Sequence, residues 1–93
     1  MNYHVVKIID GDTFEVTPHW EFQDKTGNEV RPTGYNTPER GEPGYEEAKE
    51  KLTRLLLDNY VELKNPIGLS YDRLLCDVIY EGKNLADWFP EYK

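Results

Sequence analysis

A single amphipathic helix pattern, set among segments that favour β-strands, most constrains how this chain can fold. Between residues 43 and 57, apolar side chains recur at helical spacing and define one face. A proline suits the first turn, and acidic residues lie near the positive end of the helix dipole. Two pairs of opposite charge at i,i+4 spacing, Glu47 with Lys51 and Glu50 with Arg54, add support.

Before the helix, the chain predicts a β-hairpin. The β-branched run over residues 5–9 and the alternating run over residues 13–17 read as strands. They are joined at Asp10 and Gly11, a dipeptide that is a strong hairpin signal. Pro18 is expected to end the second strand.

The segment between this hairpin and the helix is less regular. Residues 25–28 predict a turn, and residues 29–35 predict a weaker third strand. Pro32 interrupts that strand, which implies an edge position or a bulge. Residues 36–44 are rich in proline and glycine and are expected to form a loop.

Two more strands are expected after the helix, over residues 60–64 and 73–80, with a loop at 65–68 between them. A short second helix is expected over residues 84–88. The order β-β-β-α-β-β-α matches an α+β, mainly β architecture: a five-stranded barrel of the oligonucleotide/oligosaccharide-binding (OB) type. Ninety-three residues form one domain, residues 1–93.

Charge and cysteine content narrow the function classes. Eighteen acidic residues against 11 basic ones give 18 − 11 = 7 net negative charges, which counts against tight non-specific binding of nucleic acid. The lone cysteine, Cys76, excludes an internal disulfide and a cysteine zinc site. No apolar run is long enough to span a membrane, and the N-terminus is too short and polar for a signal peptide. The expectation is a cytoplasmic protein, or a piece excised from a longer one.

Asp10 and Asp12 flank a tight turn, so two carboxylates lie close together at a strand junction. Such a pair suits a hard cation such as Ca²⁺, which prefers several oxygen ligands. The alternative is a plain Asp-Gly hairpin turn. An EF-hand loop is excluded, because Phe14 and Glu15 stand where a ligand and a glycine are needed.

Arg31 and Arg73 are the arginines inside predicted strands. Each guanidinium either extends to solvent or binds an anion, and its planar fork matches phosphate oxygens. Glu39 lies in the proline-rich loop and carries no signal alone.

Together these segments resemble the signature of the staphylococcal nuclease (thermonuclease) family. Residues 10–13 match its Asp-Gly-Asp-Thr motif in full, and Arg31 followed by Asn-Thr-Pro-Glu at 36–39 resembles its arginine before Asp-Thr-Pro-Glu. Tyr-Asp-Arg at 71–73 resembles its Tyr-Gly-Arg, and residues 81–88 resemble its turn into a second helix. The resemblance covers nearly the whole chain.

The resemblance implies a Ca²⁺-dependent phosphodiesterase that hydrolyses single-stranded DNA or RNA. Asp12 would bind Ca²⁺ directly, Asn36 would be the second side-chain ligand, and Thr37 would offer its backbone carbonyl. Asp10 would support the metal site from nearby. Oligomeric state is left open.

The same resemblance assigns the remaining roles. Glu39 would act as general base or orient the attacking water, and Arg31 and Arg73 would bind the phosphate oxygens. Tyr71 would lie beside the bound nucleotide. A fixed guanidinium aimed at developing charge is worth ~3 kcal/mol.

Four departures from the family pattern predict a weakened enzyme. Asn36 replaces an aspartate, which removes a full charge and predicts weaker Ca²⁺ binding. Pro32 directly follows Arg31 and restricts its backbone to extended conformations. Asp72 replaces a glycine and is expected to bring negative charge close to the phosphate site. The family's C-terminal extension, which helps to hold the nucleotide, is expected to be missing or to be supplied by another chain.

Two functional hypotheses follow. In the first, the chain is a Ca²⁺-dependent nuclease of reduced activity. In the second, it is a nuclease-like domain whose catalysis has lapsed and that binds nucleic acid or protein. In that case the candidate stacking surfaces are Tyr3, Trp20, Phe22, Tyr35 and Tyr71. The alternative is that most aromatic residues of so small a domain belong to its core.

Overall fold

In the computed structural model, which describes residues 2–93, strands β1 (Asn2–Asp10) and β2 (Thr13–Phe22) form the expected hairpin. The prediction that Pro18 ends the second strand is wrong, because β2 continues to Phe22. The pairing of β2 with its other neighbour skips the segment between Glu15 and Trp20, so no ladder hydrogen bond is needed from the proline nitrogen.

The third strand, β3 (Lys25–Pro32), begins earlier than expected. The turn predicted at 25–28 is therefore wrong, and the chain reverses at residues 23–24 instead. Trp20 packs against Gly27, where a Cβ would lie 2.6 Å from the indole ring, and its Nε1 donates to the Glu29 carbonyl at 2.9 Å. This packing extends the hairpin. β3 ends at Pro32, three residues before the expected end.

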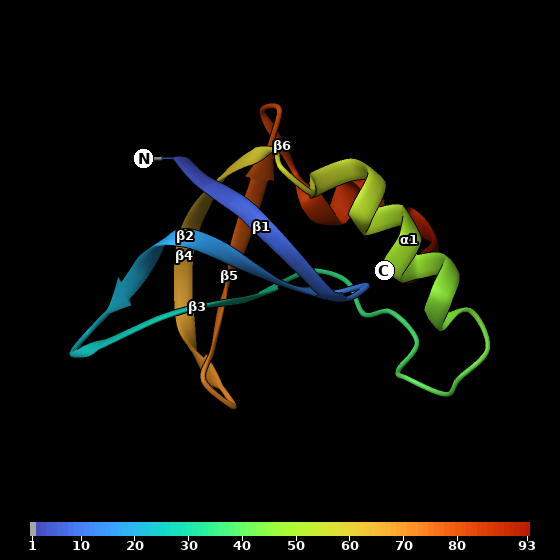
Figure 1. Ribbon diagram of the computed structural model, residues 1–93, viewed down its shortest axis with the longest axis horizontal. Coiled ribbons are helices and arrows are strands. Elements are labelled where there is room, and N and C mark those ends of the chain that lie inside the picture. Colours follow the sequence, from blue (N-terminus) through green and yellow to red (C-terminus); the bar gives the residue numbers. More distant parts are fainter. Residues whose placement is uncertain (1) are drawn as a thin grey trace.

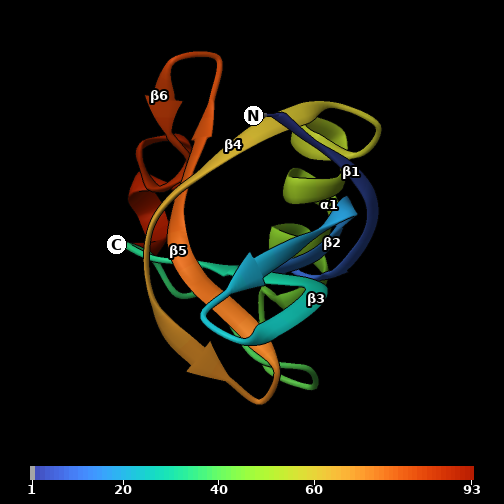
Figure 2. The ribbon, with the colours of Figure 1, turned by 90° about the vertical axis from the view of Figure 1, so that its left-hand side faces the viewer.

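The barrel closes through two later strands, β4 (Tyr60–Ser70) and β5 (Arg73–Tyr80). Strand order is β3-β2-β1-β4-β5, and a parallel pairing between β3 and β5 completes the ring, as Figure 2 shows. A two-residue strand, β6 (Lys83–Asn84), only extends β5. The predicted five-stranded OB-like barrel with one main helix is confirmed.

Strand β4 is longer than predicted, because the expected loop at 65–68 belongs to it. The pairing with β5 is irregular between Lys64 and Gly68, and Asn65 has a positive φ of 53°. The Asn65 side chain donates to Oδ2 of Asp77 on β5 at 2.9 Å. An irregular segment with proline is thus retained in the strand by a side-chain contact.

Helix α1 (Tyr45–Leu56) lies against one side of the barrel (Figure 1). It begins after Gly44, whose φ of 89° ends the preceding loop. Of the expected apolar face, four residues are buried and Leu55 is partly buried. The predicted Glu50–Arg54 pair forms, but Lys51 pairs with Glu91 instead of Glu47.

The C-terminal segment forms two 3₁₀ helices, η1 (Leu85–Trp88) and η2 (Pro90–Tyr92). The first is the predicted short helix, capped by the Asn84 side chain, which accepts from the Ala86 amide at 2.9 Å. Phe89 between them is fully buried in the core. Among the helices of residues 2–93, none has the length and apolar content needed to cross a membrane.

Candidate functional site

One cavity of about 280 Å³ gathers most of the residues that the sequence singles out. It lies where the β1–β2 turn, the strands β3 and β5, and the loop after β3 meet. The expected residues in its lining are Asp10, Asp12, Arg31, Thr37, Glu39 and Arg73. Ile9, Pro38 and Arg40 complete it.

The two arginines come from strands that pair in parallel. Val30 pairs with Leu74, and both side chains are buried in the core. Because successive side chains alternate across a sheet, Arg31 and Arg73 lie on the opposite face. The register therefore places two guanidinium groups on one side of the barrel seam.

Arg73 is held by neutral acceptors alone. Its Nε donates to the Ser70 carbonyl at 3.0 Å, and its Nη2 donates to the Ser70 hydroxyl at 3.3 Å. Its Nη1 donates to the Thr13 hydroxyl at 3.4 Å. No ion pair with any carboxylate of residues 2–93 offsets its charge. The Arg73 guanidinium is therefore oriented by hydrogen bonds, and no carboxylate neutralises its positive charge.

Arg31 is engaged with two residues expected to be metal ligands. Its Nη2 lies 3.4 Å from Oδ2 of Asp12 and also donates to Oδ1 of Asn36. The Arg31 side chain is 25% exposed and that of Asp12 is 11% exposed. The guanidinium thus satisfies two oxygens that would otherwise be open to a cation.

The two carboxylates of the β1–β2 turn are positioned by other elements. The Thr37 amide donates to Oδ2 of Asp12 at 3.3 Å. The Tyr45 hydroxyl, on the first turn of α1, donates to Oδ1 of Asp10 at 2.6 Å. That hydrogen bond to the carboxylate, together with burial, raises the pKa of Tyr45. Tyr45 therefore remains a donor to Asp10 throughout the neutral range.

The donor set fits a hard divalent cation in kind. The hydroxyl of Thr37 is buried and has no hydrogen-bond partner in the described chain, and it lies close to Gly11, where a Cβ would come within 2.8 Å of it. Carboxylate, amide and carbonyl oxygens are the ligands that Ca²⁺ accepts. The charge count is low, because Arg31 partly neutralises Asp12 and position 36 carries no charge.

Glu39 lies at the exposed rim of the cavity. Its backbone amide donates to Oε1 of Glu42 at 2.6 Å, which fixes the turn in which it lies. Its own carboxylate makes no hydrogen bond or ion pair within residues 2–93 and is open to water. An exposed, unpaired carboxylate that lines the same cavity as two arginines can accept a proton from a bound water.

Two predicted site residues do not line the cavity. Asn36 is exposed and reaches it only through Arg31. Tyr71 lies in the β4–β5 turn, 92% exposed, with the Arg73 guanidinium 5.8 Å from its ring centre. The expectation that Asp72 brings charge to the phosphate site is not met, because Asp72 faces a different hollow, beside Trp20.

Sequence reasoning missed Arg40 and Tyr45. Arg40 lines the cavity directly after Glu39. The sequence places Tyr45 only on the apolar face of the helix. Its hydroxyl is the signal that could have indicated a polar contact, since a buried phenol needs a hydrogen-bond partner.

Within residues 2–93, no three or more His, Cys, Asp or Glu side chains gather closely enough to hold a metal by themselves. A cation here would depend on the amide and carbonyl oxygens of the loop after β3. No protein-family model matches the chain, and no curated protein matches it.

Proposed function

We propose that this chain is a Ca²⁺-dependent nuclease that hydrolyses phosphodiester bonds of single-stranded DNA or RNA. The observation that carries the proposal is one cavity whose lining brings together Arg31 and Arg73 with Asp10, Asp12 and Glu39. Fixed cations for a phosphate, oxygen donors for a metal and a free carboxylate for water are the parts that this hydrolysis needs.

The two arginines would bind the non-bridging oxygens of the scissile phosphate. Arg73 is pre-oriented by Ser70 and Thr13, so little reorganisation is needed when a phosphate arrives. Arg31 would exchange its contact with Asn36 for the phosphate. Donors held in this way stabilise charge that grows on the phosphoryl oxygens as the water attacks.

Glu39 would accept the proton of the attacking water, because its carboxylate is free and lies at the mouth of the cavity. Asp12, the Asn36 side chain and the Thr37 carbonyl would hold Ca²⁺, and Asp10 would support them. When bound, Ca²⁺ supplies Lewis-acid polarisation of the phosphoryl oxygen. With Asn at position 36, we expect a high Ca²⁺ requirement.

A second candidate is a binding module of the same fold without catalysis. Arg31 favours it, because in this arrangement its Nη2 is already engaged by Asp12 and Asn36. The net charge of −7 favours it as well, since it weakens attraction of a polyanion.

The test is release of acid-soluble nucleotides from single-stranded DNA across a Ca²⁺ titration. Wild type is compared with Glu39→Gln and Asn36→Asp, and Glu47→Gln, on the exposed face of α1, is the matched control. We expect cleavage that needs Ca²⁺, is lost in Glu39→Gln, persists in Glu47→Gln and needs less Ca²⁺ in Asn36→Asp.

Absence of cleavage at every Ca²⁺ concentration in wild type would overturn the nuclease proposal. DNA binding that persists under those conditions would support the module, and its affinity should fall as salt rises.

A further inference from the structure

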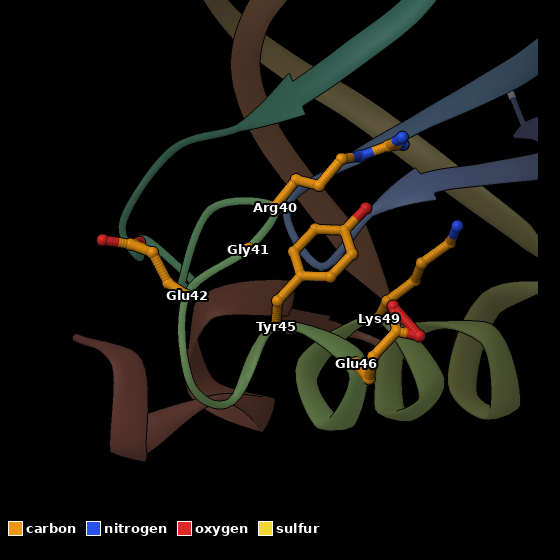
Figure 3. A pocket seen from close by; sticks show the side chains of 6 residues that line it. All are labelled: Arg40, Gly41, Glu42, Tyr45, Glu46 and Lys49. Carbon is orange, nitrogen blue, oxygen red and sulfur yellow. The ribbon is translucent and has the colours of Figure 1, made fainter.

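A second hollow, of about 420 Å³, adjoins the candidate site. Figure 3 shows the residues that line it: Arg40, Gly41, Glu42, Tyr45, Glu46 and Lys49. Arg40 also lines the candidate cavity, so one side chain borders both spaces. A single-stranded nucleic acid bound in the first cavity could therefore continue into the second.

The hollow presents two cations from different elements. Arg40 comes from the loop before α1 and Lys49 from the second turn of the helix. In Figure 3 both side chains extend toward the side of the hollow where the Tyr45 hydroxyl lies. The Arg40 guanidinium lies 6.0 Å from the centre of the Tyr45 ring.

Neither cation has a carboxylate partner among residues 2–93, although acidic residues outnumber basic ones in this chain. The neighbouring helix cations are paired, Lys51 with Glu91 and Arg54 with Glu50. Free cations beside a paired set indicate a place where an external anion can bind.

The carboxylates of the hollow are arranged so that they oppose an anion only in part. Glu42 points away from Arg40 and Lys49 in Figure 3, and its Oε1 accepts from the Glu39 amide at 2.6 Å. Glu46 lies closer to Lys49 than Glu42 does (Figure 3). The lining holds two cations and two carboxylates, and Asp10 accepts from the Tyr45 hydroxyl nearby, so an anion would be held by the two unpaired cations rather than by a net positive charge.

We propose that this hollow is a second phosphate subsite, in which Arg40 and Lys49 bind a phosphate that flanks the scissile one in a single-stranded nucleic acid. The ligand is a phosphate rather than a base, because Tyr45 is buried and Arg40 lies over its ring. The inference rests on the proposed function for the identity of the scissile phosphate. It makes the substrate an oligonucleotide with at least two phosphates.

The test measures binding without cleavage. Anisotropy of a fluorescein-labelled eight-nucleotide oligothymidylate is followed in EDTA at several salt concentrations. The variants are Arg40→Gln, Lys49→Gln and the double variant, with Arg54→Gln on the exposed face of α1 as the matched control. Circular dichroism melts establish that each variant is folded.

Each lost phosphate contact on a single strand reduces the slope of log affinity against log salt by about 0.7. We expect that decrease for each single variant and about twice that decrease for the double variant, with weaker binding at low salt. Arg54→Gln should keep the wild-type slope.

Wild-type slope and affinity in all three variants would overturn the subsite, whether or not the protein cleaves DNA. If wild type binds the oligonucleotide but never cleaves DNA, and the three variants show the reduced salt slope, the subsite is retained and only the nuclease proposal is removed. A wild type that does not bind the oligonucleotide in EDTA would overturn the subsite, and the nuclease proposal would then be decided by the cleavage assay alone.

Discussion

The hydroxyl of Tyr35 donates a hydrogen bond of 3.0 Å to the carbonyl of Gly11. This contact joins the segment after β3 to the turn that carries Asp10 and Asp12. The Tyr35 ring also stacks on Phe89, with centroids 4.6 Å apart. The buried Tyr35 side chain therefore connects three segments: the C-terminal segment, the hairpin turn and the loop of the candidate site.

Replacing Tyr35 with phenylalanine tests this relationship. Burial raises the pKa of Tyr35, so its hydroxyl stays a donor wherever the protein is folded. Removing it leaves a buried carbonyl unpaired, which costs about 1–3 kcal/mol. We expect the urea midpoint to fall and Ca²⁺-dependent cleavage to weaken. Tyr92→Phe is the control, because that hydroxyl makes no hydrogen bond in residues 2–93, and an equal loss in both variants would contradict the prediction.

The Tyr45–Asp10 contact gives a second prediction. Tyr45→Phe removes the donor that lies 2.6 Å from Oδ1 of Asp10. The carboxylate would then turn more freely, and we expect the Ca²⁺ concentration for half-maximal cleavage to rise several-fold while the fold is retained. Tyr60→Phe, at an exposed position, should leave it unchanged. An unchanged Ca²⁺ requirement in Tyr45→Phe would show that Asp10 does not depend on Tyr45.

Much of the fold could be predicted because its signals are local. Helical spacing over 43–57 and the Asp10-Gly11 turn depend on nearest neighbours, and both elements formed. The wrong turn at 25–28 had a non-local cause, since Trp20 fills the space over Gly27. Chain-local patterns do not report such packing.

The candidate site divides in the same way. The motif residues Asp12, Arg31 and Arg73 do meet at one cavity, as strand order and register require. The engagement of Arg31 by Asn36 was not predictable, because it depends on how the loop after β3 returns to the strand. The role of Tyr45 was hidden for a similar reason: its partner is 35 residues away.

On β5, Asp77 links β4 to the residue that follows β3, and acid should weaken this link. Its carboxylate accepts from the Asn65 amide group and from the Thr33 hydroxyl, and these bonds lower the pKa of Asp77 below its ordinary value. A lowered folded pKa means that this stabilisation is present above the unfolded value of about 3.9. It is lost as pH falls through the folded pKa.

Asp77→Asn keeps the shape of the side chain, but its NH₂ group would face one of the two donors, the Thr33 hydroxyl or the Asn65 amide. We expect the variant to be about 1–2 kcal/mol less stable than wild type in urea at pH 7. The difference should narrow as pH falls below about 4, because wild type then loses the same charge. Asp24→Asn, in the exposed β2–β3 turn, should match wild type throughout. A pH-independent difference would contradict the assignment to the Asp77 charge.

Cys76 offers a probe of the barrel seam that aligns Arg31 with Arg73. It is fully buried on β5, and its pairing partner across the seam is Pro32. Burial, together with the nearby Asp77 carboxylate, raises the pKa of the Cys76 thiol to about 12, so almost no thiolate forms at pH 8. We expect a thiol reagent such as dithionitrobenzoate to react slowly with native protein, at a rate that rises with urea in step with global unfolding.

Ile67→Cys in a Cys76→Ser background supplies the exposed control, because residue 67 is 70% exposed. That thiol should react at the rate of a free cysteine. Rapid labelling of Cys76 in the native protein would mean that β5 separates from β3 without global unfolding. The two guanidinium groups would then lack a fixed spacing, and a preorganised phosphate site would be contradicted by the same measurement.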